Sequence, residues 1–509
     1  MARSAFDPLP RGDPESLGVD PRVIAGFLRE ADERSAGFHG FMLVRRGVVV
    51  AEAAWKPYRL DSRHKLFSLS KSFTSTAIGL AVSEGRLSVE DSVLSFFPGK
   101  APHDASHNLR AMKVRHLLTM TTGHETDSAD RFMRSRDPVA AFLALPVELE
   151  PGTRFVYDSG ATFMLSAIVQ RLTGKRLADY LRPRLFDRIG IERPAWDRHP
   201  SGIDLGGVGL RIKLEDIARF GLLYLRKGIW NGERVLSEAW IEEATSKRVE
   251  NADSSNPDPR SDWQQGYGYQ FWRCKRGYYR GDGAFGQFCI VMPDRDAVVA
   301  AVSGTADMQG QLDLFWDRLL PGVPEEPAPS SAPGSAAAEE LRRVSGSLSM
   351  RAPAAAPGSS GGAAGRLSFV FEENWAGLSE LAFDFGADSL ELTYRVARSE
   401  PTGHVLSSPL ERPRDSGRRR LRCGYGEWID GTSWLDGEGP KPASCAGAWT
   451  DPDTFTLEVF NRETPQVLTL ACGFSPSSLR LKISLNVNMG PTEFPSIEGR
   501  PRQGRRRSP

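Results

Sequence analysis

The sequence has few cysteines, no long apolar run and almost no net charge, and each absence excludes a class of protein. Five cysteines in 509 residues, without any C-x-x-C spacing, argue against a disulfide scaffold and against a zinc site. No run of about 18 apolar residues exists, so we expect no membrane-spanning helix. The 65 basic and 64 acidic residues nearly cancel, so neither nucleic acid nor a membrane surface is an expected partner.

Further absences bear on location and chemistry. The N-terminal stretch lacks the apolar core of a secretory signal, which favours a cytoplasmic protein with reduced thiols. The eight histidines include no H-E-x-x-H motif, so we expect no metal and no other cofactor. Gly281, Gly283 and Gly286 match the G-x-G-x-x-G dinucleotide pattern, but a predicted strand follows them instead of a helix.

One change in composition divides the chain. Between residues 321 and 365, 33 of 45 residues are Ala, Pro, Gly or Ser, a mixture that cannot bury a core, although AAAEELRRVSG within it favours a short helix. We therefore expect a first domain over residues 1–320, a linker over 321–365, a second domain over 366–500 and a basic, disordered tail over 501–509.

The two domains show different patterns. Asp20 and Pro21 predict the start of a helix, and FMLVRR and VVVAEAAW flank Gly47 as a hairpin. Helical patterns follow, and strands return after residue 265, which predicts an α+β domain with one antiparallel sheet flanked by helices. Beyond residue 366, short alternating runs such as SLELTYRVA predict an all-β domain, either a sandwich or a lipocalin-like barrel.

The most informative segment is FSLSKSF, which contains an S-x-x-K pattern. A serine hydroxyl is a useful nucleophile at neutral pH only when a base takes its proton. At the first turn of a helix Ser68 and Lys71 share a face, and the apolar run that follows predicts a buried lysine with a lowered pKa. A second match, Ser62 to Lys65, lies in a polar stretch, so Ser62 is interpreted as a loop residue.

A second motif supports Ser68 as the nucleophile. Tyr157, where a loop meets an apolar helix, is the one tyrosine of ten with Asn or Ser two residues later, here Ser159. With HLLTMTTGH and GGVGLRIKLEDIARFGLLYLRKG, the chain resembles the serine β-lactamase and penicillin-binding protein superfamily over roughly residues 15–320, specifically its class C-like hydrolases. Those proteins carry S-x-x-K, Y-x-N or Y-x-S, and a K-T-G-like strand motif in this order.

The resemblance implies roles for these residues and the β-lactamase/transpeptidase-like fold for the first domain. Ser68 would form an acyl-enzyme, and Lys71 and Tyr157 would exchange its proton, with either of the two as the resting base. The N–H groups of Ser68 and Ala284 would form the oxyanion hole. Ser159 stands where many relatives have asparagine and would bind Lys71 or substrate.

The third motif departs from the family pattern. No K-[ST]-G occurs, and the matching strand segment is Gly281, Asp282 and Gly283, which we expect to contact substrate. In penicillin-recognising relatives the lysine helps to hold the substrate carboxylate. Its replacement by Gly281 removes a cation, and Asp282 adds an anion if it faces the cleft, so carboxylate-bearing β-lactams should bind poorly.

Three functions remain open. The first is a serine hydrolase acting through an acyl-enzyme on a small ester or amide, and the second is a β-lactamase or penicillin-binding D-Ala peptidase. The third is a non-catalytic binding protein that retains the fold. The G-x-S-x-G match at Gly358–Gly362 is rejected because it lies in the low-complexity linker, and His124 is expected to contact substrate or nothing. The oligomeric state is not predicted.

Overall fold

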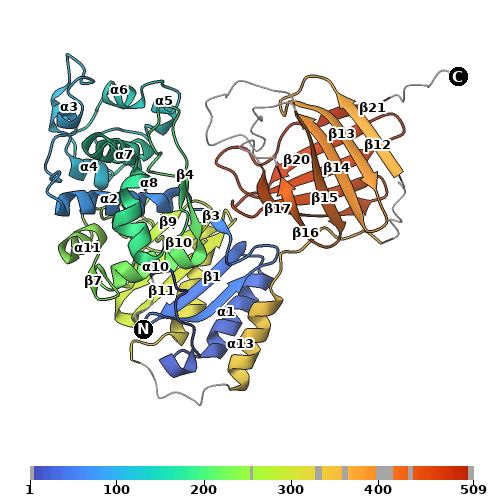
Figure 1. Cartoon of the computed structure of the whole chain (residues 1–509), viewed down its shortest axis with the longest axis horizontal. Coiled ribbons are helices and arrows are strands. Elements are labelled where there is room, and N and C mark those ends of the chain that lie inside the picture. Colours follow the sequence, from blue (N-terminus) through green and yellow to red (C-terminus); the bar gives the residue numbers. More distant parts are fainter. Residues whose placement is uncertain are drawn as a thin grey trace. The chain divides into compact units, whose positions relative to one another are not determined.

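The computed structural model describes residues 5–252, 256–326, 335–357, 365–396, 417–433 and 440–502. The chain forms two compact units (Figure 1). One unit comprises Met1–Ala54 and Leu60–Leu348, and the other comprises Trp55–Arg59 and Ser349–Pro509. The Gly358–Gly362 match and most of the basic tail lie outside the described residues.

The first unit is built on a six-stranded antiparallel sheet with the order β2-β1-β11-β10-β9-β8. Its strands are β1 (Phe38–Arg45), β2 (Val48–Ala54), β8 (Trp272–Arg273), β9 (Tyr279–Gly283), β10 (Gln287–Met292) and β11 (Ala297–Ser303). Gly47, with φ of 77°, turns the chain between β1 and β2, a left-handed conformation that favours glycine. Because β1 pairs with β11, strands from the two ends of the unit form one sheet, and the predicted α+β fold is confirmed.

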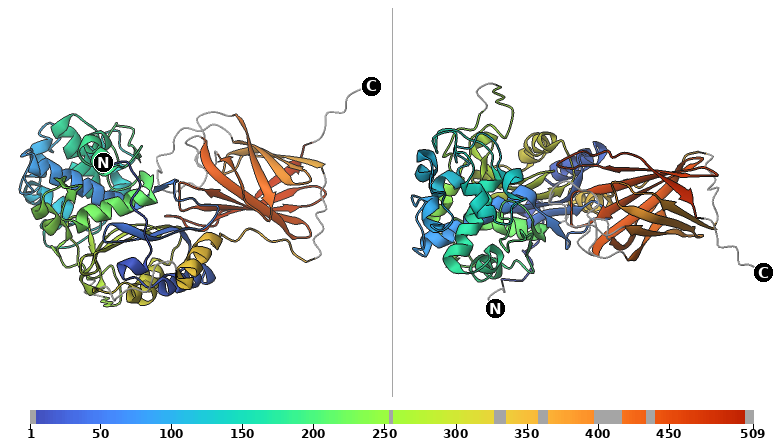
Figure 2. Two further views of the ribbon diagram at one scale, coloured as in Figure 1. Left: turned by 60° about the horizontal axis from the view of Figure 1, so that its bottom comes forward. Right: turned by 90° about the horizontal axis from the view of Figure 1, so that it is seen from above.

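Helices lie on both faces of this sheet (Figure 2). On one face α10 (Leu214–Leu225) contacts β1, β10 and β11. On the other lies α1 (Pro21–Glu33), which begins as predicted because the Asp20 side chain accepts a hydrogen bond from the N–H of Arg22. There Phe27 of α1 packs on Phe41 of β1 with ring centroids 5.0 Å apart. No helix in the described ranges is long and apolar enough to cross a membrane.

The other described elements of this unit include further α-helices and short strands. The helices are α2 (Ser70–Ser83), α3 (His107–Ala111), α4 (Val114–Leu118), α5 (Ala129–Phe132), α6 (Pro138–Leu143), α7 (Ser159–Thr173), α8 (Leu177–Leu181), α9 (Asp187–Ile189), α11 (Glu238–Thr245) and α12 (Met308–Leu314). The short strands are β3 (Arg63–Lys65), β4 (Ala195–Trp196), β5 (Leu210–Lys213), β6 (Ile229–Trp230) and β7 (Glu233–Arg234).

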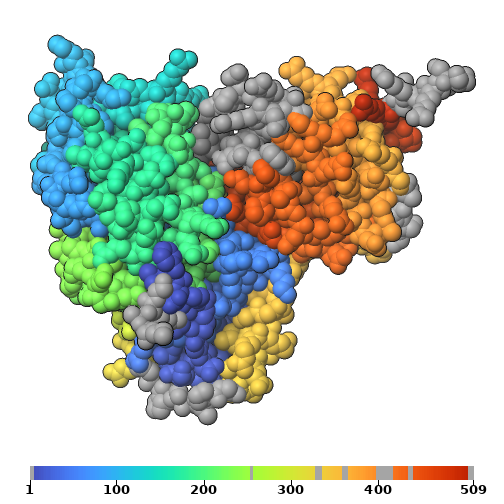
Figure 3. Space-filling view, viewed as in Figure 1, coloured from blue at the N-terminus to red at the C-terminus, as the bar shows by residue number. Residues whose placement is uncertain are grey.

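The segment rich in Ala, Pro, Gly and Ser contains one helix that packs onto the first unit. Helix α13 (Ala336–Ser347) lies against α1 and β2, and its yellow surface adjoins the dark blue of α1 in Figure 3. Ala338, Leu341 and Val344 form its buried side. Contacts of the first unit therefore continue to Leu348, beyond residue 320.

The second unit is a closed barrel of nine strands among the described residues. The order runs β15-β14-β13-β12-β21-β20-β19-β18-β17, and a pairing of β15 with β17 closes the ring. The strands are β12 (Gly365–Phe371), β13 (Leu378–Phe385), β14 (Ser389–Val396), β15 (Arg418–Tyr425), β16 (Ile429–Ser433), β17 (Lys441–Asp451), β18 (Thr454–Asn461), β19 (Val467–Phe474), β20 (Leu479–Leu485) and β21 (Ile497–Pro501). Alternate residues point into an apolar core, so of the two predicted all-β folds the barrel is observed.

A short segment from the first part of the chain belongs to this second unit. Residues 55–59 follow β2, and the carbonyl of Lys56 accepts a hydrogen bond of 2.6 Å from the N–H of Met350. Tyr58 is 4% exposed and packs edge-to-face on Phe460, with ring centroids 5.5 Å apart. The chain thus contributes to the second unit twice, at residues 55–59 and again from Ser349 onward.

This double contribution determines what happens after proteolysis. A chain cut between residues 321 and 365 should elute from a sizing column as one particle while running as two fragments on a denaturing gel. The N-terminal fragment retains residues 55–59, and these pack within the second unit. Tyr58→Ala should let the cut fragments separate, whereas Tyr58→Phe keeps the ring and should not. Separation of the cut wild-type fragments without denaturant would contradict this expectation.

Candidate active site

Ser68 and Lys71 lie at the start of α2. Ser68 is half-buried in a short 3-10 turn, η2 (Phe67–Leu69), and the α-helix itself begins two residues later than the pattern predicts. The ammonium of Lys71, on a side chain that is 1% exposed, donates a hydrogen bond of 3.0 Å to the Ser68 hydroxyl. The S-x-x-K spacing therefore brings a buried amine to an accessible hydroxyl.

Three oxygen acceptors surround the Lys71 ammonium. Besides Ser68, these are the Ser159 hydroxyl at 3.3 Å and the carbonyl of Gly207 at 3.0 Å. Burial lowers the pKa of Lys71 to about 8, although nearby carboxylates, first among them Asp127, act in the opposite direction. Sequence reasoning did not assign Gly207, because its acceptor is a backbone carbonyl that no side-chain pattern reveals.

Tyr157 covers Lys71. The Lys71 Nζ lies 4.8 Å from the centre of the Tyr157 ring, and the same ring stacks on Trp272 with centroids 5.4 Å apart. Desolvation raises the pKa of the Tyr157 hydroxyl well above its ordinary value, and a hydrogen bond with Ser68 offsets this only in part. Tyr157 is therefore a neutral phenol around neutral pH, whereas Lys71 is close to losing its proton.

Asp158 fixes the start of the helix that carries Ser159. Its Oδ1 accepts hydrogen bonds from the N–H of Gly160 at 2.8 Å and the hydroxyl of Ser128 at 2.7 Å, which caps α7. The ring of His124 is 1% exposed, with its Nδ1 3.4 Å from Asp158 Oδ2. His124 thus supports Asp158 from within the fold instead of facing the substrate.

Asp127 lies at the exposed rim of the site and was not identified from the sequence. Its Oδ1 accepts hydrogen bonds from the N–H of Ser159 at 3.0 Å and of Ala129 at 2.9 Å. Partial desolvation and the neighbouring Asp158 raise the pKa of Asp127 to about 6. The Asp127 carboxyl thereby holds the backbone of the residue that accepts a hydrogen bond from Lys71.

The glycines of the third motif let β9 approach the turn that carries Ser68. A Cβ atom on Gly283 would lie 2.0 Å from the carbonyl oxygen of Leu66, so any side chain there would collide with the backbone. A Cβ atom on Gly281 would lie 2.2 Å from Cδ1 of Leu69. A side chain at position 281 would therefore require the Leu69 side chain to move.

Asp282 is not an isolated anion. Its side chain is 6% exposed overall, and its Oδ2 accepts a hydrogen bond of 2.7 Å from Nε of Arg280. Burial raises the pKa of Asp282, and the Arg280 guanidinium opposes that effect. Residues two apart on a strand share a face. The Arg280-x-Asp282 spacing is thus a signal in the sequence for this ion pair, which was not predicted.

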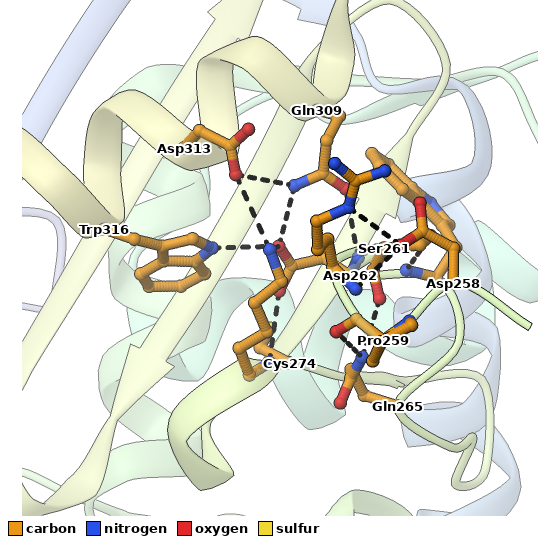
Figure 4. Close-up of polar contacts among 12 residues, drawn as sticks. Asp258, Pro259, Ser261, Asp262, Gln265, Cys274, Gln309, Asp313 and Trp316 are labelled. Atoms are coloured by element: carbon orange, nitrogen blue, oxygen red, sulfur yellow. Dashed lines mark hydrogen bonds and ion pairs between the residues drawn. The ribbon is translucent and has the colours of Figure 1, made fainter.

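Arg280 is itself held by Asp262, whose contacts with Gln309 and Trp316 are drawn in Figure 4. The carbonyl of Asp262 accepts a hydrogen bond from Nη1 of Arg280 at 3.0 Å. The buried carboxylate of Asp262 accepts hydrogen bonds from Gln309 Nε2 at 2.9 Å and Trp316 Nε1 at 3.0 Å. These contacts join β9 to α12 and the turn after it, so hydrogen bonds support the third motif.

Ala284 follows β9 in the turn to β10. Its carbonyl accepts a hydrogen bond from Gln287 Nε2 at 3.1 Å, which restrains the peptide group after Ala284. The close approach of Gly283 to Leu66 and Leu69 brings this turn beside the one that carries Ser68. The structure thus brings Ser68, Lys71, Tyr157 and Ser159 together, and the substrate contacts of the third motif and of Ala284 stay predictions.

The first unit resembles known proteins in sequence. The family model described as Beta-lactamase matches residues 28–319. A 6-aminohexanoate-dimer hydrolase of Paenarthrobacter ureafaciens is 27% identical over 302 residues, covering 56% of this chain and 76% of its own. Penicillin-binding protein 4 of Amycolatopsis lactamdurans is 28% identical over 313 residues, with 54% and 81% covered. Esterase EstB of Burkholderia gladioli is 28% identical over 171 residues, with 30% and 43% covered.

The family model spans more than half of the chain, so the protein belongs to the Beta-lactamase family, and the resemblance seen in the sequence is confirmed. In broad terms it is a hydrolase of the serine type. The three relatives carry the names of an amide hydrolase, a penicillin-binding protein and an esterase, so they do not define one substrate.

Proposed function

We propose that the protein hydrolyses small esters or amides through an acyl-enzyme on Ser68, with Lys71 as the resting base. One observation carries the proposal: the buried Lys71 ammonium lies 3.0 Å from the Ser68 hydroxyl, in surroundings that lower its pKa to about 8. A base with a pKa near the working pH is best suited to take a proton from an attacking hydroxyl. A binding protein without turnover has no need of this arrangement.

The proposed reaction begins when neutral Lys71 takes the proton from the Ser68 hydroxyl as its oxygen attacks the acyl carbon. The N–H groups of Ser68 and Ala284 stabilise the oxyanion, and preorganised donors of this kind are each worth about 3–4 kcal/mol. Tyr157, a neutral phenol beside Lys71 and Ser68, passes a proton to the leaving oxygen or nitrogen. Lys71 then passes the serine proton to Tyr157 and is neutral again. Water attacks the acyl-enzyme as Lys71 takes one of its protons, and that proton passes to the Ser68 oxygen when the acyl group leaves.

The third motif supports a preference for neutral substrates. Position 281 carries no cation, and the Arg280 guanidinium is fully buried and paired with Asp282. This pair offers a substrate carboxylate neither the free ammonium of the family's K-T-G motif nor an unpaired repelling anion. A substrate carboxylate therefore lacks the attraction of a free ammonium, which is worth on the order of 1–3 kcal/mol in a partly screened cleft.

Ser68→Ala should abolish hydrolysis and covalent labelling by a fluorophosphonate while leaving the melting temperature close to that of the wild type. Loss of a serine nucleophile lowers turnover by about a thousandfold or more. Ser62→Ala, the other S-x-x-K serine, is the matched control and should label and turn over normally. Labelling that survives in Ser68→Ala, or disappears in Ser62→Ala, would place the nucleophile elsewhere.

The pH dependence should report Lys71. Below its pKa of about 8 the lysine is protonated and cannot accept the serine proton, so log kcat/KM for a p-nitrophenyl ester should rise by about one per pH unit. Above that value the lysine is neutral and the profile should level off. A profile that is flat between pH 6 and 9, or that falls through pH 8, would argue against Lys71 as the base.

Neutral substrates should be preferred over carboxylate-bearing β-lactams. We expect kcat/KM for p-nitrophenyl acetate or a short neutral amide to exceed that for nitrocefin by about tenfold or more, because no free cation binds the carboxylate. A nitrocefin value equal to that of the best ester would favour a β-lactamase or a penicillin-binding peptidase instead.

A further inference from the structure

Two phenylalanines flank the two amides of the proposed oxyanion hole. Phe67 directly precedes Ser68, and Phe285 directly follows Ala284. Each has a backbone in the left-handed region, with φ of 47° for Phe67 and 71° for Phe285. That conformation is unfavourable for a bulky side chain, and it persists only where the surrounding structure enforces it.

The rings of these two residues meet. Their centroids lie 5.1 Å apart and the planes are inclined by 84°, an edge-to-face contact. Phe67 is 5% exposed and Phe285 is 8% exposed, so both rings are buried. Edge-to-face pairs stabilise a structure beyond the area they bury. The contact therefore joins two residues that each have an unfavourable backbone conformation.

Other contacts of the Ala284 turn run to a different part of the fold. The carbonyl of Ala284 accepts a hydrogen bond from Gln287 of β10, and the carbonyl of Phe285 accepts one from the N–H of Thr305, just after β11. These bonds attach the turn to the central sheet. The ring contact instead reaches from this turn to Phe67 and so to the turn that carries Ser68.

We propose that Phe67 and Phe285 act as an aromatic clamp that sets the distance and direction of the Ser68 and Ala284 N–H groups. The inference rests on the proposed function and adds two positioning residues to it. Phe67 supplies the carbonyl half of the peptide group whose N–H belongs to Ser68. Phe285 is bonded directly to Ala284, so a shift of its ring is transmitted to that residue.

A clamp of this kind has a defined kinetic signature. Oxyanion donors bind the charge that develops in the transition state more strongly than they bind the ground-state carbonyl. Misaligned donors therefore lower kcat while leaving KM nearly unchanged. A residue that only stabilises the fold would lower the melting temperature without this split between kcat and KM.

The test compares Phe67→Leu, Phe285→Leu and the double variant by turnover of p-nitrophenyl butyrate and by the rate of fluorophosphonate labelling of Ser68. We expect each single variant to lose about 10- to 100-fold in kcat, with KM within about threefold of the wild type. Labelling should slow in parallel, because its tetrahedral adduct uses the same donors. The double variant should be no worse than the poorer single one, because both substitutions remove one contact.

Two further variants separate the ring from the backbone. Phe285→Tyr keeps an aromatic ring and should restore most of the turnover. Phe285→Gly accepts a φ of 71° without strain but has no ring, so it should fold and still lose turnover like Phe285→Leu. It keeps the inference testable if Phe285→Leu does not fold.

A matched control lies elsewhere in the same unit. Phe27 and Phe38 form another edge-to-face pair, with centroids 5.9 Å apart and planes inclined by 72°, and each ring is 1% exposed. Phe38→Leu should lower the melting temperature by a similar amount to Phe285→Leu, with kcat within about twofold of the wild type.

The outcomes distinguish the clamp from the proposed function. If the wild-type protein shows no Ser68-dependent labelling, the proposed function fails and the clamp fails with it. If the wild type is labelled but Phe67→Leu and Phe285→Leu lose no more kcat than Phe38→Leu, the clamp alone is overturned. Single losses that multiply in the double variant, or that appear in KM instead of kcat, would also overturn it.

Discussion

The burial of one lysine is the constraint on which the rest of the site depends. Lys71 can lie inside the fold only because Ser68, Ser159 and the Gly207 carbonyl accept its hydrogen bonds. Those acceptors come from three separate parts of the chain, so the helical layer must bring them together for the lysine to be tolerated. The same burial that makes the lysine difficult to accommodate also lowers its pKa toward neutrality. Both the stability of the fold and the proposed chemistry therefore require these three acceptors around Lys71.

Patterns of a few neighbouring residues predicted the features that depend on those residues alone. The cap at Asp20, the turn at Gly47 and the shared face of Ser68 and Lys71 each depend on a few neighbouring residues, and each is observed. The role of Gly207 could not be read in this way, since any residue supplies a carbonyl. Closure of the β domain into a barrel rests on a pairing of only two residues of β15 with β17, which alternation of apolar residues within single strands does not specify.

The third motif contains a buried ion pair and no free lysine. The sequence has Gly281 and Asp282 where we expected the family's lysine motif. In the structure, Asp282 is paired with the buried Arg280. Asp262 supports that cation through its carbonyl and is itself satisfied by Gln309 and Trp316. A buried charge of this kind is costly unless it is paired and hydrogen-bonded, and here it is both. The result is a strand segment whose buried charges are paired with each other.

The packing of residues 55–59 within the second unit has a consequence for biosynthesis. Tyr58 leaves the ribosome well before Phe460, the ring on which it packs. At about 5–20 residues per second, the roughly 400 residues between them take about 20–80 s to translate. Throughout that interval the aromatic segment just upstream of Ser68 lacks its partner. The second unit must therefore stay incomplete until β18 has been synthesised, although its first segment, residues 55–59, is already present.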